Sequence, residues 1–380
     1  MRIRAIAFVA CMVLSTMTSS AQSIRPETIK DEPIGWMRVY NFGPPTKPVV
    51  VDHRTYSIAQ LSIANQIANW LQASFTPTGV LGDAIRSISE RLSPYNQYTA
   101  SLPQSYGAYA KLYTDLKYDA AKKMVPATNG NYVFSVLANG FTGEVALDLS
   151  SPERIYFTLP PFDLQGGEAG KALEKQADVS SHPVLGKYPT FFQRNSVNGN
   201  RRWIFITRDY KLPYTKVTRG EYITAMDAAV KRRYAEEKKK LDAEHNRKYA
   251  EVALANLERD HAARLVKLQA AREKYKARLT EPAQISTESP SSLLNDEDLF
   301  DGTGNSGFSL QVYTIDPAVT ERAKTGQPEW ILVGWTARNG VDPVLDHLHE
   351  AVTKRFNFEY LHDYFFAPEK VKGQPYTPRR

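Results

Sequence analysis

A run of 61 helix-forming residues, Arg219 to Leu279, constrains this chain more than any other feature of its sequence. The run contains no proline, and its single glycine stands next to its start. Because proline and glycine are the residues that most disfavour a helix interior, the run predicts a long helix or two helices folded against each other. Thr218 and Glu221 match a capping box, and Val217 and Tyr222 occupy the positions of a hydrophobic staple. The helix is therefore expected to begin directly after Thr218.

The same run carries the positive charge of the protein. Between Lys231 and Leu279 there are 15 Lys and Arg against 8 Asp and Glu, an excess equal to the net charge of +7 of the whole sequence. The rest of the chain is near neutral, which argues against a general nucleic-acid-binding surface. The sequence thus predicts a basic helical arm on a near-neutral body. Two compact groups of cations are its candidate binding residues: Lys231, Arg232, Arg233, Lys238, Lys239 and Lys240.

Two shapes of this arm are open. Every residue between Asp242 and Lys248 except Asn246 is an acceptable helix former, which favours a straight helix about 90 Å long. The same stretch has almost no apolar side chain, and Asn246 suits a position just past a helix end, so a hairpin of roughly 25 and 30 residues is the alternative. A partial coiled-coil seam, which would serve self-association or docking to a protein partner, recurs every seven residues at Leu254, His261, Leu268 and Tyr275.

The N-terminus predicts export. Arg2 and Arg4 precede an apolar stretch from Ala5 to Leu14, and the small residues Ser19 to Ala21 follow, which together are typical of a secretory signal in residues 1–21. The only cysteine, Cys11, lies within that signal, so the mature chain offers no disulfide and no thiolate. We therefore expect a periplasmic or extracellular protein without a transmembrane segment.

The remaining sequence predicts an α+β body with a mixed or antiparallel sheet and packed helices, from which the long charged helix, or helical hairpin, projects. Residues 22–217 are expected to form the body, 218–280 the basic helix, 281–306 an acidic flexible linker, and 307–380 further strands and helix that complete the body. Ser57 to Ala73 and Val80 to Leu92 have the apolar spacing of helices, and Asn198-Gly199 indicates a hairpin between two strands.

A tyrosine-rich segment is a second candidate binding surface. Tyr106, Tyr109 and Tyr113 are spaced i, i+3, i+7, which would place three rings on one helical face. Rings on one face either complete the core or, if exposed, stack on sugars or pack on a partner.

No arrangement of residues in the sequence identifies a reaction. Residues 346–350 are rich in His and carboxylates, but their spacing does not match a zinc motif, and no nucleophile elbow or phosphate-binding loop is present. No metal and no cofactor are therefore predicted. The leading hypothesis is a non-catalytic envelope or extracellular binding and scaffold protein that uses the basic arm on a partner or an anionic envelope surface. The alternative is a hydrolase of envelope polymers whose His and carboxylate side chains meet only in the fold.

Overall fold

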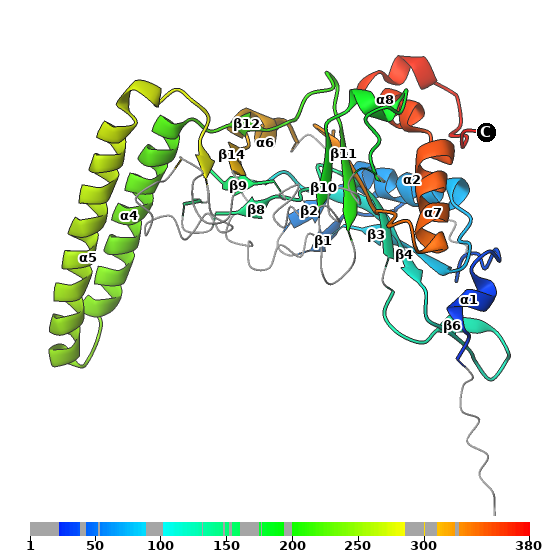
Figure 1. The fold of residues 1–380 in the computed structure, drawn as a ribbon, viewed down its shortest axis with the longest axis horizontal. Helices are drawn as coiled ribbons and strands as arrows, with labels where there is room; N and C mark the ends of the chain where they lie inside the picture. Colours follow the sequence, from blue (N-terminus) through cyan, green and yellow to red (C-terminus); the bar gives the residue numbers. More distant parts are fainter. Residues whose placement is uncertain are drawn as a thin grey trace, which may run out of the picture.

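The computed structural model describes residues 23–38, 43–51, 54–88, 102–130, 132–146, 149–151, 154–159, 175, 177–193, 200–285, 300, 310–323 and 327–380. The signal segment 1–21 and the Asn198-Gly199 turn lie outside these residues. The described chain has an α+β fold in which every strand ladder is antiparallel, as the sequence predicts. Figure 1 shows the sheets in the middle of the molecule, helices α2, α7 and α8 at one end, and a long pair of helices, α4 and α5, at the other.

Six described strands form the main sheet, in the order β10-β11-β15-β7-β4-β3. One face of this sheet packs under helices α2, α7 and α8 in a core that includes Leu61, Ile67, Tyr106, Val136 and Phe358. Ser57 caps α2 by a capping box, with its hydroxyl accepting the N–H of Gln60. The bounds are β3 Leu81–Ser87, β4 Tyr106–Tyr113, β7 Tyr132–Ala138, β10 Thr190–Gln193, β11 Arg201–Ile206, β15 Ile331–Thr336, α2 Ile58–Ser74, α7 Pro343–Glu350 and α8 Phe358–Phe366.

A second sheet packs against the opposite face of the main sheet. Its described path is β12-β14-β9-β8, and β13 also pairs with β14. Trp203, Phe205 and Leu332 of the main sheet meet Val145 and Phe157 of the second sheet in one buried cluster. The bounds are β8 Glu144–Val145, β9 Tyr156–Thr158, β12 Thr215–Lys216, β13 Gln284–Ile285 and β14 Leu310–Thr314.

The remaining elements are short. They comprise the hairpins β1–β2 and β5–β6, the helices α1 and α6, a π-helical turn that continues α7, and three 3-10 turns. Their bounds are α1 Pro26–Ile29, β1 Val49–Val51, β2 Arg54–Tyr56, β5 Leu116–Tyr118, β6 Met124–Pro126, α6 Pro317–Ala323, the π-helical turn Ala351–Arg355, and the 3-10 turns Leu185–Lys187, Lys276–Arg278 and Pro368–Val371.

The tyrosine-rich segment is a strand, so the prediction of a helix there is wrong. Tyr106 to Tyr113 forms β4, paired on one side with β3 and on the other with β7. Side chains alternate across a strand, and Tyr106 is therefore buried under the helices while Tyr109 and Tyr113 belong to the opposite, partly exposed face. The helix expected from Val80 to Leu92 is also wrong, because Leu81 to Ser87 forms β3.

The pair α4 and α5 is inserted into an edge strand of the second sheet. The Val217 amide donates to the carbonyl of Val312, and the amide of Val312 donates to Ala283. Val217 and Ala283 thus lie beside the same residue of β14, and the carbonyl of Val217 accepts the amide of Ala283 at 2.8 Å. Residues 218–282 therefore leave and re-enter the sheet at one point, which fixes the base of the helical pair to the body.

The long run folds as a hairpin, and not as the straight helix that its composition favours. Helix α4 spans Arg219–Asp242 and α5 spans Arg247–Lys274, and we call these helices with the turn between them the basic hairpin. Asn246 has a different role from the one expected, because its side chain accepts the N–H of Tyr249 and caps the start of α5. The capping box of Thr218 and Glu221 at the start of α4 is confirmed.

Part of the expected acidic linker 281–306 is ordered. Ala283 and Gln284–Ile285 pair with β14, and Phe300 is buried against the rings of Tyr222 and Tyr275. The segments 286–299 and 301–309 lie outside the described residues. The two ordered parts fix the C-terminal end of the basic hairpin to the body.

Candidate functional site

The base of the basic hairpin is a buried cluster around one arginine. Arg219 is 5 % exposed, and its guanidinium lies 5.3 Å from the ring centres of Tyr275 and Phe300. Its Nη2 is 3.3 Å from a carboxylate oxygen of Glu281, which pairs the buried charge. Tyr222, Ile223 and Met226 of α4 pack in the same core as β14. These contacts hold the hairpin at a fixed place on the body.

The seven-residue seam that the sequence offers for self-association is used inside the hairpin. Leu268 and Tyr275 of α5 are buried in the core shared with α4. The ring of His261 stacks on Tyr234 of α4, with ring centres 4.3 Å apart and planes 21° apart. Because these positions already face α4, they are not available to a second copy of the chain.

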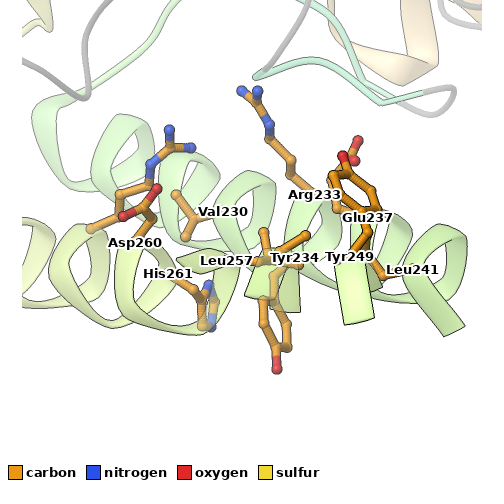
Figure 2. Close-up of a pocket in the computed structure, with 11 residues that line it drawn as sticks. Val230, Arg233, Tyr234, Glu237, Leu241, Tyr249, Leu257, Asp260 and His261 are labelled. Atoms are coloured by element: carbon orange, nitrogen blue, oxygen red, sulfur yellow. The ribbon is translucent and has the colours of Figure 1, made fainter. Parts of the chain in front are cut away.

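A groove of about 310 Å³ runs between the two helices beyond this seam. Figure 2 shows Arg233 directed to one side of the hairpin and the rings of Tyr234 and His261 directed to the other. The groove is lined by Arg233 and Arg264 and also by Glu237 and Asp260, so its charges balance. The groove is therefore not the source of the positive charge of the hairpin.

Most of the predicted cations on α4 interact within the chain. Lys231 pairs with Asp227 at 2.7 Å, and Lys240 pairs with Glu237 at 2.8 Å. Arg232 donates to the carbonyl of Ser150 in the body at 2.7 Å, and the ammonium of Lys238 lies 6.0 Å from the ring centre of Tyr234. Arg233 lines the groove. Lys239 is exposed and has no ion pair within the described part of the chain.

Within the basic hairpin, the described cations that face solvent without an ion pair are mainly on α5, and the sequence reasoning missed them. Arg247, Lys248, Lys267 and Arg272 are exposed, and none of them has an ion pair among the described residues. Figure 1 shows α5 on the far side of α4 from the sheets, so α5 presents the outermost surface of the hairpin. A helical projection of residues 247–274 would have revealed them, whereas runs of adjacent cations draw attention to α4.

The predicted tyrosine site is not a single surface. Tyr106 is fully buried and burial raises the pKa of its hydroxyl well above the usual range. Tyr113 lies on the other face, where the ammonium of Lys111 is 5.3 Å from its ring centre. The three rings are therefore divided between the core and the opposite face of the sheet, and the premise of one shared helical face is wrong.

The described histidines of the body do not form one cluster, although, besides burial, the nearby His182 also lowers the pKa of His349. His182 is held by backbone groups, with Nε2 3.0 Å from the carbonyl oxygen of Thr353, while His347 lies 3.3 Å from Asp31. His362 Nδ1 is 2.9 Å from the carboxylate of its neighbour Asp363. His53 lies outside the described residues. Among the residues that are described, no three His, Cys, Asp or Glu side chains are grouped so that they could hold a metal ion.

His349 provides a prediction of pH dependence. Burial, followed by the charges of Arg338 and Arg202, lowers its pKa to about 4. The unfolded chain, with an ordinary pKa of about 6.5, binds the proton first as pH falls. The stability is therefore complete above about pH 6.5 and is lost progressively between about pH 6.5 and pH 4, by about 2 kcal/mol for a ring that solvent partly reaches.

Urea unfolding of the wild type and of His349→Gln at pH 7, 5 and 4 measures this effect. The variant should lose less stability than the wild type as the pH falls through this window. Parallel losses in both proteins would assign the acid sensitivity to other groups.

Comparison with known proteins adds no family assignment to this geometry. No protein-family model, no curated protein and no solved structure matches the chain. The class that the structure defines is an α+β protein with a basic helical hairpin inserted in an edge strand. No described helix combines the length and the apolar character that a membrane span requires.

Proposed function

We propose that this chain is an exported, non-catalytic binding or scaffold protein of the cell envelope or the extracellular space, and that the basic hairpin is its contact element. One observation supports the proposal most directly: the basic hairpin carries an excess of positive charge, and its cations without an ion pair lie mainly on α5, an outward helix that two strands and a buried core hold in place. A charge excess on a fixed, projecting element raises the local concentration of anionic partners and steers their approach.

The observed packing favours an anionic partner over self-association. The side chains of the apolar seam pack against α4 within the hairpin. What remains outward is cationic, and two such surfaces repel each other. The hydrolase alternative remains a prediction from the sequence, and no grouping of described side chains favours it.

Retention on an anionic matrix tests the proposal. Changing Lys239, Arg247, Lys248, Lys267 and Arg272 together to Gln should lower the salt concentration at which the full chain elutes from a dextran sulfate column, because five outward charges are removed. The matched control changes five exposed body lysines to Gln: Lys30, Lys47, Lys123, Lys211 and Lys216. The control removes the same net charge, so an equal shift in both variants would show that the hairpin is not the contact element.

A further inference from the structure

Three of the large apolar side chains that the described chain exposes lie on α5. Tyr249 is 59 % exposed, Val252 61 % and Val266 69 %. Exposed apolar residues scattered singly over a surface are ordinary, but these lie on one helix. They require a different explanation from the cations around them, because a dissolved polyanion gains nothing from apolar side chains.

Helical geometry places these side chains in one arc with cations. At about 100° per residue, Lys248, Val252, Arg259 and Val266 fall within roughly 40° of one another around the axis of α5, and Tyr249 and Lys267 continue that arc. The four carboxylates of α5, Glu251, Glu258, Asp260 and Glu273, project outside it. Tyr249, at the edge of this arc, lines the groove against α4. The outer α5 surface therefore comprises Lys248, Val252, Arg259, Val266 and Lys267, and all five residues are exposed.

The outer α5 surface faces away from the rest of the molecule. Leu268, Ala271 and Tyr275, which are buried against α4 and the base, project from the other side of α5. Lys248 and Lys267 stand nineteen residues apart, which corresponds to about 28 Å along the helix. Figure 1 shows no described element beyond α5 on this side. A flat partner could therefore meet the whole surface at once.

We propose, building on the function inferred above, that the outer α5 surface binds anionic lipid headgroups, with α5 lying in the plane of the lipid interface. Lys248 and Lys267, which have no ion pair among the described residues, attract the acidic headgroups, whereas Arg259 lies 3.7 Å from the carboxylate of Asp260. Val252 and Val266 enter the boundary between headgroups and acyl chains, where an amphipathic helix buries its apolar side chains. The observations favour lipid over a soluble polyanion because the cations and the exposed valines share one arc.

Co-sedimentation of the full chain with vesicles tests this inference. We expect binding to vesicles that contain about 30 % phosphatidylglycerol, weak binding to pure phosphatidylcholine, and weakening between about 0.05 M and about 0.5 M salt as headgroup attraction is screened. Lys248→Gln with Lys267→Gln should weaken the partition to acidic vesicles about 25-fold, since each lysine contributes about fivefold near such a surface. Val252→Ser with Val266→Ser should weaken it about tenfold.

Matched variants separate the outer α5 surface from general effects. Val50 and Val341 are 68 % and 86 % exposed on the body, so Val50→Ser with Val341→Ser removes equally exposed valines elsewhere. Lys47→Gln with Lys123→Gln removes two exposed body lysines. Both controls should bind vesicles as the wild type does, and circular dichroism should be unchanged in every variant.

The outcomes distinguish the two proposals. Hairpin-dependent retention on dextran sulfate without binding to acidic vesicles would overturn the lipid inference and leave the binding function standing. Vesicle binding that the valine variant does not weaken would also overturn it, because the partner would then be recognised by charge alone. If the hairpin variants bind dextran sulfate and acidic vesicles as the wild type does, both proposals are wrong.

Discussion

Trp330→Ala is expected to lower the free energy of unfolding by about 4–5 kcal/mol, a large part of the roughly 5–15 kcal/mol that stabilises a typical protein. Trp330 is fully buried, and its indole N–H donates to the carbonyl oxygen of Gly140 at 2.7 Å. Its ring meets Tyr214 edge to face, with ring centres 5.5 Å apart, within the cluster that joins the two sheets. The substitution therefore opens a cavity between the sheets and leaves a buried carbonyl without a donor.

Urea unfolding followed by circular dichroism measures the loss. Trp330→Phe keeps a ring but removes the donor, so it should cost about 1–2 kcal/mol. Val341→Ala, at an exposed position, should stay within about 0.5 kcal/mol of the wild type. A loss below about 1.5 kcal/mol in the alanine variant would mean that the two sheets do not depend on this shared core.

The predictions that the structure confirms rest on local signals that allow one interpretation. The capping box at Thr218 requires a specific pair of side chains three residues apart, and α4 begins where Thr218 and Glu221 predict. The α+β class follows from the apolar patterns along the chain, some of which repeat with the period of a helix and others with the period of a strand. Such features are encoded within a few neighbouring residues and need no tertiary information.

The wrong predictions come from spacings of apolar residues that fit both the helical repeat and the strand repeat. Leu81 and Ile85, like Tyr109 and Tyr113, are four residues apart, and four residues match one helical turn and also two full repeats of a strand. Within β4, Gly107 lies where a Cβ would come within 2.2 Å of the carbonyl oxygen of Val136, so the close approach of β7 requires glycine there. Pairing with strands that are distant in the sequence decides that these segments form strands and not helices. The sequence alone does not show that pairing.

The sequence predicts which part of the chain carries the excess charge but not which of its cations the fold exposes. The sequence places the excess charge between Lys231 and Leu279, and a hairpin was one of the two shapes considered. Which cations face outward depends on how α4 and α5 pack, and that packing turns Arg232 toward Ser150 and leaves Lys248 and Lys267 in solvent. Rows of adjacent charges predict local charge density, but the tertiary fold decides which side chains a partner can reach.

Tyr275→Ala is expected to release the basic hairpin from its base while the main sheet stays folded. Tyr275 is 2 % exposed in the core that the hairpin shares with β14, and its ring contacts Phe300 edge to face, with ring centres 5.0 Å apart. Its removal leaves a cavity and takes away one of the two rings beside Arg219, which should cost about 3–5 kcal/mol.

Hydrogen exchange locates that loss, because a local cost of about 3 kcal/mol lowers amide protection roughly 150-fold. Amides of α4 and α5 should lose protection in Tyr275→Ala, and those of β11 and β15 should not. Val266→Ala, on the exposed side of α5, should change neither set. Equal loss of protection in the hairpin and the main sheet would show that the arm and the body unfold as one unit.

Tyr222→Phe is expected to have the opposite effect on stability to Tyr275→Ala, although both residues lie at the base of the basic hairpin. The hydroxyl of Tyr222 is buried without a hydrogen-bond partner among the described residues, so its removal should be neutral or stabilising by up to about 1 kcal/mol. A stabilised base should also keep the outer α5 surface in place and leave its lipid binding unchanged. The contrast with Tyr275→Ala therefore separates the stability of the base from the chemistry of the surface it supports.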